Sequence, residues 1–160
     1  MSLSPAQLQT LKAAILADPV LAPLTSGPGS DHDAIAQAMS AEASPAFYVW
    51  RSSYSPQQMR SAMTVNLGTA QLDGLSAGKR DALLWFIGDT VSPADPAVIA
   101  TLNDFCGSQN TLKASLVDGG KRKALRGEKI LATGTGTLVS PATMGYEGAV
   151  STQVIVTIFG

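Results

Sequence analysis

The chain has 160 residues, of which 45% are hydrophobic and 14% charged, so the composition supports a folded core and excludes a disordered polyelectrolyte. Its 11 Lys and Arg residues nearly balance its 12 Asp and Glu residues, and a net charge of −1 favours contact between copies. One cysteine, Cys106, and one histidine, His32, exclude an intrachain disulfide and a zinc site built from these two residue types.

The start of the chain lacks the basic region and the apolar core of a signal peptide. The longest strictly apolar run, residues 82–87, is too short to span a bilayer. We therefore expect a cytoplasmic protein that makes no membrane contact.

Two similar motifs open two of the expected helices. Ser-Pro-Ala-Gln at 4–7 and Ser-Pro-Gln-Gln at 55–58 each combine a capping serine, a proline at the first helical position and a glutamine that closes a capping box. They predict one helix that ends at Asp18-Pro19 and another that ends at about Met63.

Other capping residues predict helices that begin at Ser30, Ser76 and Asp95, and shorter helices are expected over 108–117 and 121–132. The helix from Ser76 contains the longest apolar run, so we expect it to be the central helix of a bundle. The aromatic residues and the cysteine of this region are expected in the core: Trp50, Trp85, Phe86, Phe105 and Cys106.

The last 28 residues, 133–160, hold one charged residue, Glu147, and no helical pattern. Residues 150–159 are uncharged at every position and rich in β-branched side chains, which predicts a strand. The expected fold class is therefore mainly α, a multi-helix bundle over 1–132 followed by an extended C-terminal β-arm or hairpin over 133–160.

An exposed strand of this composition would aggregate, so it needs a partner. One partner is the chain's own domain, through Leu138-Val139 or residues 47–50, a segment that is itself either a buried strand or a turn. The other is a neighbouring subunit or another protein, by strand addition. The residues expected to form such an interface arm are Val150, Val154, Ile155, Val156, Ile158 and Phe159.

The basic residues of the C-terminal quarter are clustered. Residues 121–160 carry five bases and two acids, whereas residues 1–120 carry six bases and ten acids. If 121–132 is one helix, Arg122, Arg126 and Lys129 share a face. That face is a solvated surface, a contact for an acidic protein, or a contact for DNA phosphate. The candidate contact residues are Lys121, Arg122, Lys123, Arg126 and Lys129.

No catalytic, metal-binding or cofactor-binding residues are predicted. Gly-Thr-Gly at 134–136 follows a helix and lacks a dinucleotide fingerprint's third glycine, and Gly-Lys-Arg at 120–122 lacks the hydroxyl residue of a phosphate loop. Asp-His-Asp at 31–33 lies at a helix start, where acids are expected without a metal. We expect a protein that is not an enzyme and that needs no cofactor.

Four stretches resemble a family of small structural proteins encoded among the head and tail genes of tailed bacteriophages, and together they cover about half the chain in the right order. They are the leucine-rich first helix with Asp-Pro at 18–19, Ala-Ser-Pro-Ala-Phe-Tyr-Val-Trp-Arg-Ser at 43–52, the segment from Lys-Arg-Lys-Ala at 121–124 through Glu-Lys-Ile-Leu-Ala-Thr-Gly-Thr-Gly-Thr at 128–137, and Pro-Ala-Thr-Met-Gly-Tyr-Glu-Gly at 141–148. Family members usually continue with a Ser-Tyr-Gln-Asp-Val-like stretch, where this chain has the more apolar Ser-Thr-Gln-Val-Ile at 151–155.

The resemblance implies a head-to-tail connector, or adaptor, that is made in the host cytoplasm and resides at the head–tail junction of the virion. Such a protein forms a homo-oligomeric ring on the portal, contacts other neck or tail proteins, and can touch packaged DNA. Two alternatives remain open: a capsid decoration or tail completion protein, and a DNA-binding accessory protein that uses the basic residues 121–129.

Overall fold

The computed structural model describes residues 3–66 and 70–160, and it is mainly helical. The chain forms two compact units. The split unit combines Met1–Val49 with Lys123–Gly160, and the inserted unit consists of Trp50–Arg122. Residues 133–160, expected as a separate arm, are therefore grouped with the beginning of the chain.

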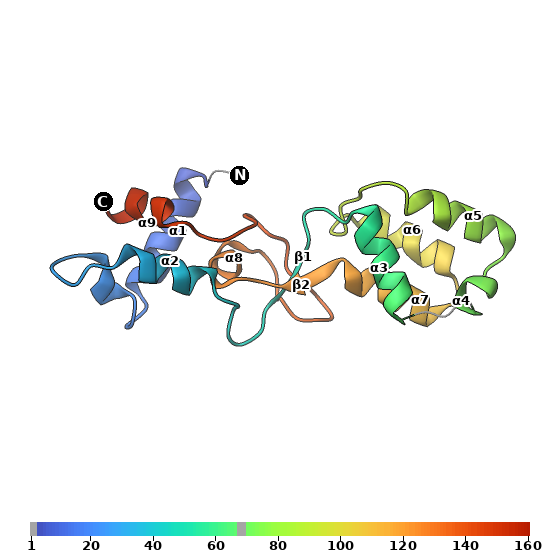
Figure 1. Ribbon diagram of the computed structural model, residues 1–160, viewed down its shortest axis with the longest axis horizontal. Coiled ribbons are helices and arrows are strands. Elements are labelled where there is room, and N and C mark those ends of the chain that lie inside the picture. The colour runs from blue at the N-terminus through green and yellow to red at the C-terminus, as the bar shows by residue number, and fades with distance from the viewer. Residues whose placement is uncertain (1–2, 67–69) are drawn as a thin grey trace. The chain divides into compact units, whose positions relative to one another are not determined.

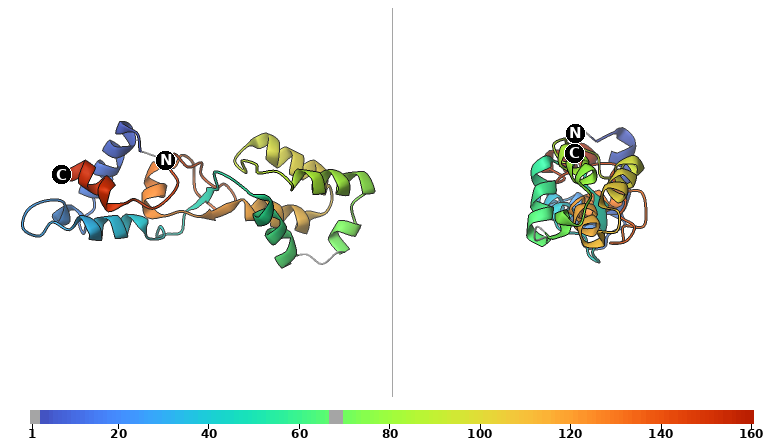
Figure 2. Two further views of the ribbon diagram at one scale, coloured as in Figure 1. Left: turned by 45° about the horizontal axis from the view of Figure 1, so that its top comes forward. Right: turned by 90° about the vertical axis from the view of Figure 1, so that its right-hand side faces the viewer.

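In the split unit the first and last helices of the chain lie side by side (Figures 1 and 2). Its elements are α1 (Pro5–Leu16), the 3₁₀ helix η1 (Ala22–Thr25), α2 (His32–Ser40), α8 (Arg126–Leu131) and α9 (Thr152–Phe159). Both α8 and α9 pack against α1 and α2. Segments from the two ends of the sequence therefore share one hydrophobic core.

The capping box predicted at the start of the chain is confirmed. The hydroxyl of Ser4 accepts a hydrogen bond from the Gln7 amide at 3.3 Å, and the Gln7 side chain accepts one from the Ser4 amide at 2.8 Å. These bonds satisfy two amides that would otherwise lack partners at the start of α1. They orient the helix so that Leu11 and Ile15 are buried in the core.

The prediction of a C-terminal β-strand is wrong, because Thr152–Phe159 is the helix α9. Ser151 caps it by accepting a hydrogen bond from the Val154 amide at 3.4 Å. As a helix, the segment places Ile155 and Ile158 on one face, where both are buried with α1 and α2 residues. Burial of this face outweighs the β-propensity of the segment, which is a weak local preference.

The inserted unit consists of α3 (Pro56–Asn66), α4 (Ala70–Asp73), α5 (Ala77–Phe86), α6 (Pro96–Cys106) and α7 (Asn110–Gly119). The helix α7 packs against α3, α4 and α6, so it occupies the central position that we expected for α5. Of the α5 residues only Leu83 is fully buried. The central position of α5 is thus a wrong prediction, although its start at the Ser76 cap is confirmed.

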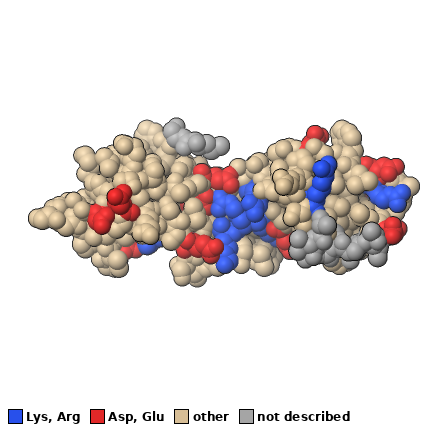
Figure 3. Space-filling view, in the orientation of Figure 1, with Lys and Arg blue, Asp and Glu red and all other residues tan. Residues whose placement is uncertain are grey.

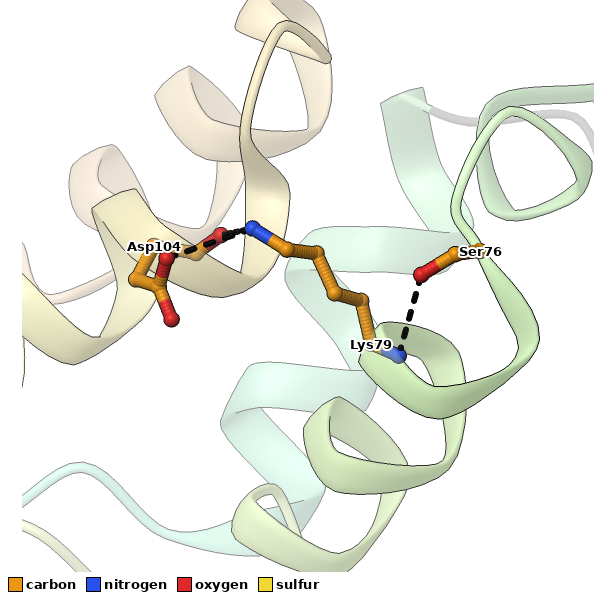
Figure 4. A network of polar contacts seen from close by, with 3 residues as sticks. All are labelled: Ser76, Lys79 and Asp104. Carbon is orange, nitrogen blue, oxygen red and sulfur yellow. Dashed lines mark hydrogen bonds and ion pairs between the residues drawn. The ribbon is translucent and has the colours of Figure 1, made fainter.

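A lysine connects α5 to α6 in the inserted unit (Figure 4). The ammonium group of Lys79 donates to the main-chain carbonyl of Asp104 and lies 3.2 Å from its carboxylate. The amide of Lys79 meanwhile donates to the capping hydroxyl of Ser76 at 3.4 Å. One residue therefore joins the start of α5 to the last turn of α6.

The small sheet of the protein pairs β1 (Tyr48–Trp50) with β2 (Lys121–Lys123) in antiparallel orientation. The sequence did not decide whether residues 46–50 form a strand or a turn. In the structure this segment contains the strand β1. The helix predicted over 121–132 is wrong in its first part, because Lys121–Lys123 is extended and α8 begins only at Arg126.

Candidate functional site

The five basic candidate residues lie on two different elements. Lys121, Arg122 and Lys123 belong to β2, whereas Arg126 and Lys129 belong to α8. The common helical face predicted for Arg122, Arg126 and Lys129 is therefore wrong. Two contacts explain the difference. The strand β1 pairs with Lys121–Lys123, and the Glu128 carboxylate accepts a hydrogen bond from the Leu125 amide at 2.8 Å, which starts the helix after β2.

Most of these basic side chains contact acidic groups of their own unit. Lys121 lies 2.8 Å from the Asp118 carboxylate, and Lys123 lies 3.3 Å from that of Glu42. In Figure 3, acidic side chains in red border a cluster of basic side chains in blue. The basic residues therefore do not form the uniformly positive surface that is typical of a phosphate-binding face.

Arg126 forms an ion pair with Asp18 in the split unit. The amide of Val20 donates to the Asp18 carboxylate at 2.8 Å, and this hydrogen bond is the largest cause that lowers the pKa of Asp18. The Arg126 guanidinium lowers the pKa further, while partial desolvation opposes both effects. Asp18 thus stays ionised and holds Arg126 against the end of α1.

The structure does bring Arg126 and Lys129 together. Both line an open cavity of about 350 Å³ in the split unit, with Ser44, Ala43, Ala14 and Ile130. The ammonium of Lys129 lies 5.7 Å from the ring centroid of Phe47, within the range of a cation–π contact. This cavity can accept a carboxylate or phosphate of a partner, since the side chains that line it supply positive charge and a hydroxyl.

The expected interface arm is largely covered by its own unit. Val150, Ile155 and Ile158 are buried in the core of the split unit. Val154 and Phe159 are half-buried against the same core, and Val156 is 38% exposed. In this fold the three buried residues are covered by their own unit and need no neighbouring subunit. The reason for expecting strand addition is therefore gone.

Two large apolar side chains, the most exposed among the described residues, were not predicted at the surface. Trp85 on α5 was expected in the core and is 76% exposed, while Val139 in a loop of the split unit is 92% exposed. Spacing could have placed Trp85: Leu83 and Ile87, four residues apart, face the core, so a residue midway between them points away from it. By contrast, Phe86 and Phe105 are half-buried against the core of the inserted unit, and their ring centroids lie 5.7 Å apart in an edge-to-face arrangement.

Cys106 is buried, as predicted. Burial raises the pKa of its thiol, and the nearby Lys113 and Lys79 only partly oppose this. Among residues 3–66 and 70–160, no group of three His, Cys, Asp or Glu side chains is placed to hold a metal ion. Within the same residues, no helix has both the length and the hydropathy that a bilayer crossing requires.

Comparisons with protein-family models, with curated proteins and with solved structures found no match for this chain.

Proposed function

We propose that this chain is a non-enzymatic structural protein of a tailed-phage virion, a head-to-tail connector that forms a homo-oligomeric ring on the portal. The resemblance of residues 43–52, 121–137 and 141–148 to phage head and tail proteins supports the virion setting. The observation that carries the assembly role is the exposure of large apolar side chains on both units of a weakly charged chain, led by Trp85 and Val139.

Such residues favour assembly for a physical reason. Covering an aromatic or aliphatic side chain releases water from apolar surface, which contributes roughly 25 cal/mol for each Å². A net charge of −1 adds little repulsion between copies. Both features stabilise contacts between copies of a protein that self-associates. Neither feature stabilises a protein that remains monomeric.

The Arg126–Lys129 cavity supports a contact with an acidic protein surface such as that of a portal. Arg126 already binds one carboxylate, that of Asp18, and Lys129 lies at the same cavity. A second carboxylate brought by a partner can join this arrangement. The ion pairs of Lys121 and Lys123 with Asp118 and Glu42 favour this role over a track for DNA phosphates.

Disrupting the gene in its phage tests the proposal. For a connector we expect DNA-filled heads and separate tails that fail to join, visible by negative-stain electron microscopy, with joining restored by the wild-type gene. Tailed particles with fragile heads would instead indicate a decoration protein. Normal particles in normal number would overturn the virion role altogether.

A further inference from the structure

An exposed tryptophan defines one surface of the inserted unit. Trp85 is 76% exposed and Leu84 beside it is 49% exposed, although both belong to α5, a helix whose other face is buried through Leu83. Asp81, one turn earlier, is also exposed on the Trp85 face. No ion-pair partner of Asp81 is found in the part of the chain that the structure describes. We call Asp81, Leu84 and Trp85 the α5 surface.

The split unit carries a projecting apolar turn. Leu138 and Val139 are 52% and 92% exposed, and they form the tip of a turn between Thr137 and Ser140. The Thr137 amide donates to the Ser140 carbonyl at 3.0 Å, and the Ser140 amide donates to the Thr137 hydroxyl at 2.9 Å. We call Leu138 and Val139 the 138–139 turn.

The base of this turn is fixed on the split unit. The Tyr48 amide donates to the Gly136 carbonyl at 2.7 Å, and Gly136 has φ of +65°. The Phe47 ring packs directly on Gly136, because a Cβ at this position would lie 2.0 Å from the ring. A turn held this firmly loses little conformational entropy when a partner covers its tip.

We infer that the 138–139 turn of one copy docks on the α5 surface of a second copy. Both surfaces present large apolar side chains, and they carry opposite charges: Asp81 belongs to the α5 surface, while Lys129 lies beside Phe47 at the base of the turn. A symmetric contact of two α5 surfaces would instead place two Asp81 carboxylates and no Lys129 in the same interface. The other exposed aliphatic pair of the split unit, Leu16 and Val20, flanks the acidic Asp18 and suits the α5 surface less.

This contact joins two different surfaces, so each copy keeps one free surface of each kind and can bind further copies head to tail. Contacts of this type generate rings or filaments. The inference deepens the proposed ring and rests on it for its biological meaning, but the contact itself is a property of the purified chain.

The test introduces a positively charged side chain at the centre of each surface. Trp85→Lys and Val139→Lys change exposed residues, and circular dichroism should show both variants folded. By sedimentation velocity at high protein concentration, we expect the wild type to self-associate and each variant to lose association by more than about tenfold. An equimolar mixture of the two variants should form a one-to-one dimer, since each supplies the surface that the other lacks. A chain with both substitutions should stay monomeric, alone and in any mixture.

The control is Val20→Lys, which alters an aliphatic side chain of the split unit that is 73% exposed and should leave association unchanged. Three results would overturn the inference: a monomeric wild type, single variants that still associate, or a mixture that stays monomeric. Gene disruption tests the connector role separately. Sedimentation can therefore contradict this contact while gene disruption supports the connector role, and it can support the contact while gene disruption contradicts that role.

Discussion

Replacing Ile155 by alanine should destabilise the split unit by about 3 kcal/mol, because the side chain is fully buried against α1 and α2 and its loss leaves a cavity. Urea unfolding followed by circular dichroism measures the loss. Trp50 and Trp85 both lie in the inserted unit, so tryptophan fluorescence reports that unit separately.

Val156→Ala is the matched control, since Val156 is the next residue of α9 and is 38% exposed. We expect a change of less than about 0.5 kcal/mol, helped by the better helix propensity of alanine. In a strand, Val156 would lie on the same face as Val154 and Ile158, opposite Ile155. A larger loss for Val156→Ala than for Ile155→Ala would therefore contradict the helix.

Replacing Glu128 by alanine should also cost about 3 kcal/mol, although the residue is charged. Its side chain is fully buried, and its two carboxylate oxygens accept the amides of Leu125 and Gly148, each at 2.8 Å. The first bond starts α8, and the second holds the segment that leads to α9. Alanine removes both hydrogen bonds and leaves two half-buried amides without their acceptor, which makes the loss large.

Two further variants serve as comparisons for Glu128→Ala in the same unfolding assay. Glu128→Gln keeps one acceptor oxygen and the side-chain volume, so we expect an intermediate loss. Glu42→Ala removes an exposed carboxylate that pairs with Lys123, and it should change stability by less than about 1 kcal/mol. Equal effects of the Glu42 and Glu128 substitutions to alanine would show that the buried carboxylate does not organise this region.

Features fixed by neighbouring residues could be predicted from the sequence. The capping box at Ser4, the cap at Ser76 and the start of α6 after the Asp95 cap all appear where the motifs placed them. Each depends on one side chain that bonds an amide two or three residues away, so it requires no distant contact.

Features fixed by distant contacts could not be predicted. The α9 segment has the composition of a strand, and its burial against α1 and α2, over 110 residues earlier in the chain, favours the helix that Ser151 caps. Lys121 to Lys123 form a strand because β1 pairs with them, although the same residues would fit a helix. Burial of α9 also removes residues 150–159 as the candidate interface, whereas the exposure of Trp85 could have been predicted from its spacing to Leu83 and Ile87.

The position and copy number of this protein in the intact particle test the connector proposal most directly. Cryo-electron microscopy of purified virions should show a symmetric ring of copies between portal and tail, with Trp85 of each copy covered by its neighbour. Copies spread over the capsid shell, or a particle without the protein, would contradict it.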